Sequence, residues 1–308
     1  MNRPICIIGP TACYKTETAV LLAEKLHGEI ISDDSVQVYK ELKIGSAKPS
    51  VEECRGIPYH LVDLIAPDDR SFSVQAFQVL ANQCINDILS RNLRPIICGG
   101  SGLYVNALIT PLNFAIPRDA DIRSRIESSY DQSPERVYFM LQNIDPETAA
   151  RLHMHDKKRI VRALEVFECS GKKLSEFGNQ FQDGIDHPRS EICLIGLNMD
   201  RERLYSRINQ RVDRMMGDGL LEEVQSLFEK YPDPSLPAMQ AIGYRQFFPY
   251  FSGEISLETA VEQVKQETRR FAKRQLIWFR RNPNIQWFSM DNGPEPVIES
   301  IINTIEGK

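Results

Sequence analysis

The chain has 308 residues, of which 42% are hydrophobic and 26% are charged. This length suits one large or two medium domains, and both proportions are ordinary for a soluble globular protein. No apolar run approaches the roughly 18 residues that a membrane span needs, and the first residues lack the apolar stretch of a secretory signal. The net charge of -5 argues against indiscriminate coating of nucleic acid but is compatible with a local basic surface.

The seven cysteines indicate neither a disulfide framework nor a metal-thiolate site. Cys6, Cys98 and Cys193 lie in apolar segments, where a free thiol behaves as a small hydrophobe. The chain has no CxxC pair, and His153 and His155 have no cysteine cluster beside them. We therefore expect a reducing cytoplasm.

The first segment reads as strand, loop and helix. Residues 4–8 form a short apolar run, a Gly-Pro turn signal follows, and apolar residues then recur with helical spacing up to Leu26. Further strand-like runs occupy residues 29–32 and 95–98. Continuous apolar strands separated by helices predict a parallel sheet that is covered on both faces.

The middle of the chain has a different character. Residues 118–190 read as helices, and strand character returns at residues 191–197, so the helical block looks like an insertion. Two long helical patterns follow at about residues 201–230 and 257–281, before a final strand at about residues 285–288.

Residues 9–16, GPTACYKT, are expected to form a phosphate-binding loop between the first strand and the first helix. Backbone N–H groups at the start of a helix can surround phosphate oxygens, while Lys15 neutralises charge and the Thr16 hydroxyl can bind Mg²⁺. Tyr14 stands where the usual GxxxxGK[ST] pattern has its second glycine. If the backbone needs positive φ there, a tyrosine costs about 1–2 kcal/mol, and its ring could crowd the ligand. An ordinary strand–turn–helix junction remains the alternative.

A pair of carboxylates, Asp33 and Asp34, follows the second strand. In open parallel sheets this end of a strand faces the ligand crevice. A carboxylate here could accept a proton or hold a metal-bound water, and Gln37 could recognise the edge of a base. Equally, the two aspartates could cap a helix. The glycine-rich residues 45–49 and 99–104 are either binding loops or simple turns.

The order of these segments resembles the bacterial tRNA dimethylallyltransferase family. The resemblance rests on the blocks GPTA, DSxQxY, IGxAKP and GG[ST]xLY, followed by blocks at residues 159–166, 204–213, 238–244 and 268–275. It implies a P-loop NTPase-like parallel sheet flanked by helices, with an inserted, mostly helical domain that contacts tRNA. The implied boundaries are residues 1–117 and 191–308 for the catalytic core and 118–190 for the insertion.

The resemblance also implies a role for each matched residue. The donor diphosphate would be held by Gly9, Thr11, Ala12, Cys13, Tyr14, Lys15 and Thr16, with Mg²⁺ at Thr16. Asp34 would be the general base, Ser101 would lie beside the target base in place of the family's threonine, and Arg211 would contribute to the donor diphosphate. Contacts to tRNA are implied at Asp34, Ser35, Val36, Gln37, Ser101, Arg123, Lys158, Arg159, Arg162, Arg269 and Lys273.

The implied activity is transfer of a dimethylallyl group from dimethylallyl diphosphate to the N6 amine of the adenosine on the 3′ side of the anticodon. The expected partners are that donor and the anticodon stem-loop of tRNA, and the expected protein is a cytoplasmic monomer without a membrane span. The chain departs from the family at Tyr14 and at Lys157 and Lys158, which replace a common Pro-Gln. From the loop pattern alone, we expect Tyr14→Gly to raise donor affinity.

Three other functions stay open at this point: a non-catalytic tRNA-binding relative with a decayed loop, an enzyme that prenylates free adenine nucleotides, and a P-loop kinase. The residues favour tRNA through two helices with basic faces. In residues 157–168, Lys158 and Arg162 are expected opposite the apolar residues Ile160, Leu164 and Phe167. In the C-terminal helix, an apolar stripe is expected at Val264, Phe271 and Trp278, opposite a basic side made of Lys265, Arg269, Lys273 and Arg280.

Overall fold

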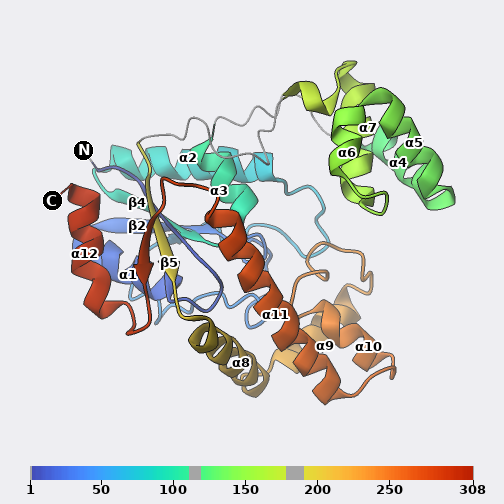
Figure 1. The fold of residues 1–308 in the computed structure, drawn as a ribbon. Coiled ribbons are helices and arrows are strands. Elements are labelled where there is room, and N and C mark those ends of the chain that lie inside the picture. Colours follow the sequence, from blue (N-terminus) through green and yellow to red (C-terminus); the bar gives the residue numbers. More distant parts are fainter. Residues whose placement is uncertain (1, 111–118, 178–190, 308) are drawn as a thin grey trace. The chain divides into compact units, whose positions relative to one another are not determined.

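The computed structural model describes residues 2–110, 119–177 and 191–307. The chain divides into two compact units, one made of Met1–Pro111 and Asp186–Lys308 and the other of Leu112–Ile185. Figure 1 shows the ribbon of both units. In the described residues, no helix is long and apolar enough to cross a membrane.

The first unit is built on one sheet of six parallel strands in the order β3-β2-β4-β1-β5-β6. The strands are β1 (Ile5–Ile8), β2 (Gly28–Asp33), β3 (Tyr59–His60), β4 (Arg94–Gly99), β5 (Cys193–Asn198) and β6 (Gln286–Ser289). The strands β1 and β2, which both lie inside the sheet, are buried at every position, as a sheet with both faces covered requires. The predicted parallel α/β class is therefore confirmed, although the short strand β3 was not foreseen.

Helices cover both faces of the sheet. On one face α1 (Lys15–Leu26) packs with α12 (Glu295–Glu306), and their apolar residues share a core with Ile7, Ile30 and Ile96 of the strands. On the other face lie α2 (Val74–Ser90) and α3 (Gly102–Ile109), which contact each other (Figure 1). Successive side chains of a strand point to opposite faces, which explains why each strand serves both helical layers.

The remaining helices of this unit form a second core. They are α8 (Arg201–Gly217), α9 (Leu220–Lys230), η2 (Arg245–Phe247), α10 (Phe248–Phe251) and α11 (Leu257–Phe279). The single helical pattern expected at residues 201–230 is wrong, because the backbone turns at Gly219 with a φ of 99° and starts a new helix. Glycine permits this left-handed conformation without the clash that a Cβ atom causes.

The expected apolar stripe on α11 is also wrong in part. Its buried positions are Ala260, Val264, Ala272, Gln275 and Phe279, whereas Phe271 and Trp278 are only half-buried. The physical reason is that a straight helix drifts by about 20° for each heptad, so a strict seven-residue spacing leaves the buried face.

The second unit is a small helical bundle in its described residues. It contains α4 (Ala120–Gln132), α5 (Pro134–Ile144), α6 (Pro146–Arg151), α7 (Lys157–Ser170) and η1 (Leu174–Phe177). Its core joins Ile126 and Tyr130 of α4 to Leu141 of α5 and Ile160 and Leu164 of α7. Aspartate side chains cap several of these helices at their first turns, as at Asp119 and Asp156.

Candidate active site at the carboxyl edge of the sheet

The carboxyl ends of three neighbouring strands meet at one edge of the sheet. The register pairs Ile8 of β1 with Gly99 of β4, and Gly99 with Asp33 of β2. The phosphate-binding loop, Asp34 and Ser101 follow these three strand ends and therefore start side by side. Gly9 is required at its position, because a Cβ atom there would lie 2.5 Å from the carbonyl oxygen of Leu197.

A cleft of about 840 Å³ opens at this edge, within the first unit. Its lining includes the loop residues Thr11 to Thr16, Asp34 and Gln37. The opposite side is lined by three arginines of α8, namely Arg207, Arg211 and Arg214. Their spacing of four and three residues places them on one face of the helix. Of these arginines, our sequence analysis identified Arg211 and missed Arg207 and Arg214, although all three occupy one helical stripe.

Tyr14 adopts the strained conformation that its position in the loop demands. Its φ of 57° and ψ of 19° lie in the left-handed region, directly before α1 begins at Lys15. The guanidinium carbon of Arg207 lies 3.7 Å from the centre of the Tyr14 ring, and Arg207 Nη1 donates a hydrogen bond of 2.6 Å to the phenol oxygen. A left-handed tyrosine costs about 1–2 kcal/mol, whereas such stacking contributes about 0.5–2 kcal/mol. The stacking therefore offsets much of the strain.

Three cations donate hydrogen bonds to the loop. Lys15 Nζ donates to the carbonyl oxygen of Pro10 (2.7 Å), Arg207 Nε donates to that of Ala12 (3.0 Å), and Arg211 Nη1 donates to the Thr11 hydroxyl (3.4 Å). In the part of the chain that the structure describes, none of the three has a carboxylate within 4.0 Å. Burial lowers the pKa of both Lys15 and Arg211. Because unpaired buried charge is unfavourable, the arrangement suits an anion with several negative oxygens.

Of the two adjacent aspartates, only Asp34 lines the cleft. Its Oδ1 accepts hydrogen bonds from the backbone N–H groups of Val36 (2.8 Å) and Gln37 (3.3 Å). Burial raises the pKa of Asp34, and these two hydrogen bonds oppose that shift. A carboxylate with raised proton affinity, facing a cleft, is suited to take a proton from a substrate.

Asp33 has a different environment. It is fully buried, and neither of its carboxylate oxygens has a hydrogen-bond partner among the described residues. Burial raises the pKa of Asp33 well above its ordinary value, and the neighbouring Asp34 raises it further. Asp33 is therefore an acidic residue of the protein interior and does not line the cleft, whereas Asp34 does.

Ser101 lies close to the backbone beyond Asp34. Its Oγ accepts a hydrogen bond of 3.1 Å from the N–H group of Ser35 and lies 3.4 Å from the Ser35 hydroxyl. The structure thus brings Asp34, Ser35 and Ser101 together, although they come from different strand ends.

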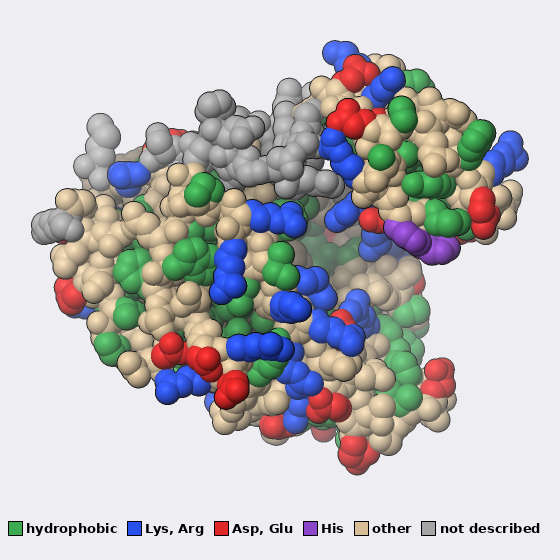
Figure 2. All heavy atoms as spheres, in the orientation of Figure 1, with side chains coloured by type: hydrophobic (Ala, Val, Ile, Leu, Met, Phe, Trp, Pro, Cys, Tyr) green, Lys and Arg blue, Asp and Glu red, His purple; other side chains and the backbone are tan. Residues whose placement is uncertain are grey.

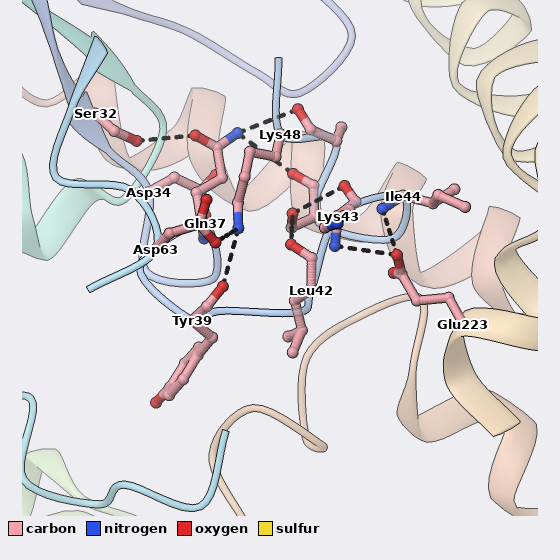
Figure 3. A network of polar contacts seen from close by, with 12 residues as sticks. Ser32, Asp34, Gln37, Tyr39, Leu42, Lys43, Ile44, Lys48, Asp63 and Glu223 are labelled. Carbon is pink, nitrogen blue, oxygen red and sulfur yellow. Dashed lines mark hydrogen bonds and ion pairs between the residues drawn. The ribbon is translucent and has the colours of Figure 1, made fainter. Parts of the chain in front are cut away.

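Gln37 is engaged by the protein itself (Figure 3). Its Oε1 accepts a hydrogen bond from the Ser32 hydroxyl (2.9 Å), and its Nε2 donates to the carbonyl oxygens of Ser46 (3.4 Å) and Ala47 (3.2 Å). The side chain lines the cleft, but its amide nitrogen is hydrogen-bonded within the protein and holds residues 46 and 47 in place.

Glu223 was missed by sequence analysis, and it organises the segment that follows Gln37. Its two carboxylate oxygens accept hydrogen bonds from the backbone N–H groups of Lys43 (3.1 Å), Ile44 (2.8 Å) and Gly45 (3.1 Å), and from the Tyr244 hydroxyl (2.8 Å). Figure 3 shows this carboxylate directed from α9 toward the segment. A Cβ atom at Gly45 would lie 2.5 Å from the Tyr244 ring, so only glycine fits. A glutamate on an amphipathic helix carries no sequence signal for such a role.

Gln275 of α11 was also missed. Its Oε1 accepts a hydrogen bond from the Thr11 N–H group (2.8 Å), and its Nε2 donates to the carbonyl oxygen of Gly100 (2.9 Å). One buried amide thus joins the phosphate-binding loop to the turn before Ser101. The Thr11 N–H group is therefore already occupied, so this donor does not face a ligand.

The lining of the cleft fits magnesium that is bound together with a diphosphate. Thr16 offers a hydroxyl oxygen in the cleft, and magnesium prefers oxygen ligands and retains several waters. Within the described ranges, no group of three or more His, Cys, Asp or Glu side chains could hold a metal ion. Such an ion would thus take most of its ligands from the substrate and from water.

The basic residues expected to contact RNA differ in how strongly the protein engages them. In the second unit, Arg123 and Arg162 both pair with the buried carboxylate of Glu165, while Lys158 and Arg159 are exposed. In the first unit, Figure 2 shows Lys and Arg side chains gathered along α11.

Two of the basic residues of α11 are held by carboxylates. Arg269 donates to Asn209 (2.6 Å) and Glu262 (2.8 Å), and Lys265 pairs with Asp213 (2.5 Å). Lys273 is exposed. The basic side of α11 is therefore partly neutralised by the protein itself.

Comparison with known proteins gives consistent matches over the whole chain. The model of the IPP transferase family matches residues 37–282. A tRNA dimethylallyltransferase from Anoxybacillus flavithermus is 44% identical, over 100% of this chain and 97% of that protein. A relative of the same name from Alkaliphilus oremlandii is 42% identical, over 99% of this chain and 98% of that protein.

Solved structures that resemble this chain belong to proteins with similar names. The tRNA isopentenylpyrophosphate transferase from Bacillus halodurans has a TM-score of 0.75 at 39% identity, and the match covers 100% of this chain and 96% of that one. A eukaryotic dimethylallyltransferase described as acting on tRNA has a TM-score of 0.84 at 27% identity, with coverage of 100% and 80%. The family resemblance of the sequence is thereby confirmed.

Proposed function

The chain belongs to the IPP transferase family, and on that premise we propose that it transfers a dimethylallyl group from dimethylallyl diphosphate to tRNA. The acceptor is the exocyclic N6 amine of the adenosine on the 3′ side of the anticodon. One observation carries this proposal: the cations Lys15, Arg207 and Arg211, which have no acidic partner among the described residues, share one cleft with the carboxylate of Asp34.

The cations fit the leaving group of the reaction. An allylic diphosphate departs with charge separation, so positive groups fixed near its oxygens stabilise the anion where charge develops. Lys15 and Arg211 each donate a hydrogen bond to a loop residue, Pro10 and Thr11 respectively, and so are already in place before the ligand binds. Thr16 would hold Mg²⁺, which adds positive charge beside the diphosphate when it is bound.

Asp34 fits the acceptor side of the reaction. The N6 amine of adenine is a poor nucleophile because its lone pair is delocalised into the ring. A carboxylate that removes its proton as the new bond forms contributes about 10²–10⁴-fold in rate. The adenine must leave its stack to reach a cleft, and the Ser101 hydroxyl, which accepts a hydrogen bond from the N–H group of Ser35 next to Asp34, would meet it there.

The tRNA partner gives a role to the helical insertion, residues 118–190 by our sequence boundaries. Its exposed Lys158 and Arg159 can contact phosphates, which fix position more than sequence. The other proposed RNA contacts are Ser35, Val36, Gln37, Arg123, Arg162, Arg269 and Lys273. The enzyme would act as a monomer in the cytoplasm, and the free state of all seven cysteines suits that compartment.

A transfer assay tests the proposal directly. The protein is incubated with dimethylallyl diphosphate, Mg²⁺ and either unmodified anticodon stem-loop RNA or AMP, and the products are analysed by mass spectrometry. We expect the RNA to gain one dimethylallyl group and AMP to remain unmodified. Preferential modification of AMP would indicate a nucleotide prenyltransferase. RNA binding without transfer would indicate a non-catalytic relative with a decayed loop.

A further inference from the structure

Tyr14 has a partner that a glycine could not have. The Arg207 guanidinium stacks 3.7 Å from the centre of its ring, and Arg207 Nη1 also donates to the phenol oxygen at 2.6 Å. The ring is itself packed against the apolar core under α1. Tyr14 thus links a rigid core to a charged side chain at the cleft.

The Arg207 guanidinium has N–H donors that no described residue uses. Of the five N–H donors of a guanidinium, the described hydrogen bonds use two, one to Ala12 and one to Tyr14. In the described ranges, no carboxylate lies within 4.0 Å of Arg207, so its charge is not neutralised by the protein. Since Arg207 lines the cleft beside the loop, the remaining donors are available to an anion bound there.

We propose that Tyr14 is a positioning residue, which fixes the Arg207 guanidinium over the loop as part of the donor diphosphate site. This inference rests on the proposed function. A free arginine has many rotamers, and ordering it upon binding reduces affinity. The stacked ring orders it in advance. On this inference Tyr14 raises the affinity for the donor, whereas the loop pattern alone predicts that a tyrosine in place of the glycine lowers it.

The test measures binding of inorganic pyrophosphate and of dimethylallyl diphosphate by titration calorimetry. The variants are Tyr14→Gly, Tyr14→Asn and Tyr14→Phe, each in the wild-type and in the Arg207→Ala background. Asparagine is the matched control because it tolerates the left-handed backbone yet lacks a ring. Thermal unfolding checks that each variant folds.

We expect Tyr14→Gly and Tyr14→Asn to weaken binding of both ligands by about tenfold, and Tyr14→Phe by about threefold, because the phenyl ring keeps the stacking. In the Arg207→Ala background the same changes should alter affinity less than twofold. In transfer assays the donor KM should rise while kcat and RNA affinity stay nearly constant.

Two results would overturn the inference. One is a glycine variant that binds pyrophosphate as tightly as the wild type or more tightly. The other is an equal loss of affinity with and without Arg207, which would indicate an effect of the backbone alone. If the wild-type protein binds neither ligand, the proposed diphosphate site fails, and this outcome is distinguishable from failure of the positioning role.

Discussion

At the scale of single residues, the environment separates two neighbouring aspartates. Asp33 and Asp34 are adjacent in sequence, yet alternate side chains of an extended strand point in opposite directions. Asp34 reaches the cleft, whereas Asp33 is buried and its carboxylate has no hydrogen-bond partner in the described part of the chain. The same chemical group therefore faces the cleft at one position and is enclosed by the protein at the next.

Replacing Asp34 by asparagine should lower the rate of transfer by about 10²–10⁴-fold, because the general base is lost while the shape is kept. RNA affinity should stay within a few-fold. The base acts only when deprotonated, and burial raises the pKa of Asp34, so the wild-type rate should fall on acidification at a higher pH than an ordinary aspartate would give. Single-turnover rates against pH measure this, and a near-normal rate for Asp34→Asn would exclude the role.

Asp33 should make stability depend on pH. Burial raises the pKa of Asp33 in the folded state above its pKa in the unfolded chain. The protonated side chain therefore favours folding at low pH, and this contribution is lost as the pH rises above the pKa of Asp33 in the unfolded chain. Asp33→Asn removes the titration. The free energy of unfolding of this variant, relative to the wild type, should therefore increase from pH 4 to pH 7. A constant difference in urea denaturation over this range would show that Asp33 is not perturbed.

At the scale of elements, the candidate active site depends on helices that hold loops in place. Glu223 of α9 binds three successive N–H groups of the segment at Lys43 to Gly45, and Gln275 of α11 joins two loops. These helices are remote in sequence from the loops that they hold. Their polar side chains substitute for the regular hydrogen bonds that a loop lacks.

Glu223→Ala should free the segment at residues 43–45 and destabilise the protein by about 1–3 kcal/mol, since the hydroxyl of the buried Tyr244 and the partly buried N–H groups of Ile44 and Gly45 lose their acceptor. Hydrogen–deuterium exchange should accelerate at the amides of Lys43, Ile44 and Gly45. Glu222→Ala is the control, because Glu222 is the exposed neighbour on the same helix. Equal exchange in both variants would contradict the holding role.

At the scale of the whole molecule, one ion cluster joins the edge strand β3 and its neighbour β2 to a helix. Glu29 of β2 accepts hydrogen bonds from both terminal nitrogens of Arg91, which follows α2, and contacts His60 of β3 at 2.7 Å. The Glu29 side chain is 8% exposed, whereas Arg91 is 41% exposed. Hydrogen bonds from Arg91 lower the pKa of Glu29 to about 2.

This cluster should stabilise the protein at neutral pH and make that stability sensitive to acid. A depressed pKa means that the stabilisation is present above the ordinary pKa of glutamate and is lost as the pH falls toward 2. Glu29→Gln should reduce the free energy of unfolding at pH 7 by roughly 1–3 kcal/mol, allowing for solvent screening at Arg91. The difference should shrink on acidification. Glu24→Gln, which breaks an exposed pair with Arg55, should cost less than about 1 kcal/mol.

Much of the fold could be predicted from sequence because its signals are local. Neighbouring residues are enough to recognise the apolar runs of β1, β2 and β4 as buried strands. They are also enough to recognise the GPTACYKT segment as a phosphate-binding loop. The long helical pattern at residues 201–230 failed for a local reason as well, because Gly219 ends one helix and begins another. The α11 face failed because a seven-residue spacing drifts off the buried face of a straight helix, which here buries Gln275 and leaves Trp278 half-buried.

The sequence by itself determined the parallel sheet, the place of the phosphate-binding loop and the family, because periodicity and motif order are properties of the chain. Only the tertiary structure decided that Tyr14 meets Arg207, 193 residues away, and that Glu223 holds Ile44, 179 residues away. It also decided which aspartate faces the cleft. Such contacts depend on how helices pack against the sheet, and packing brings together residues that no local pattern relates.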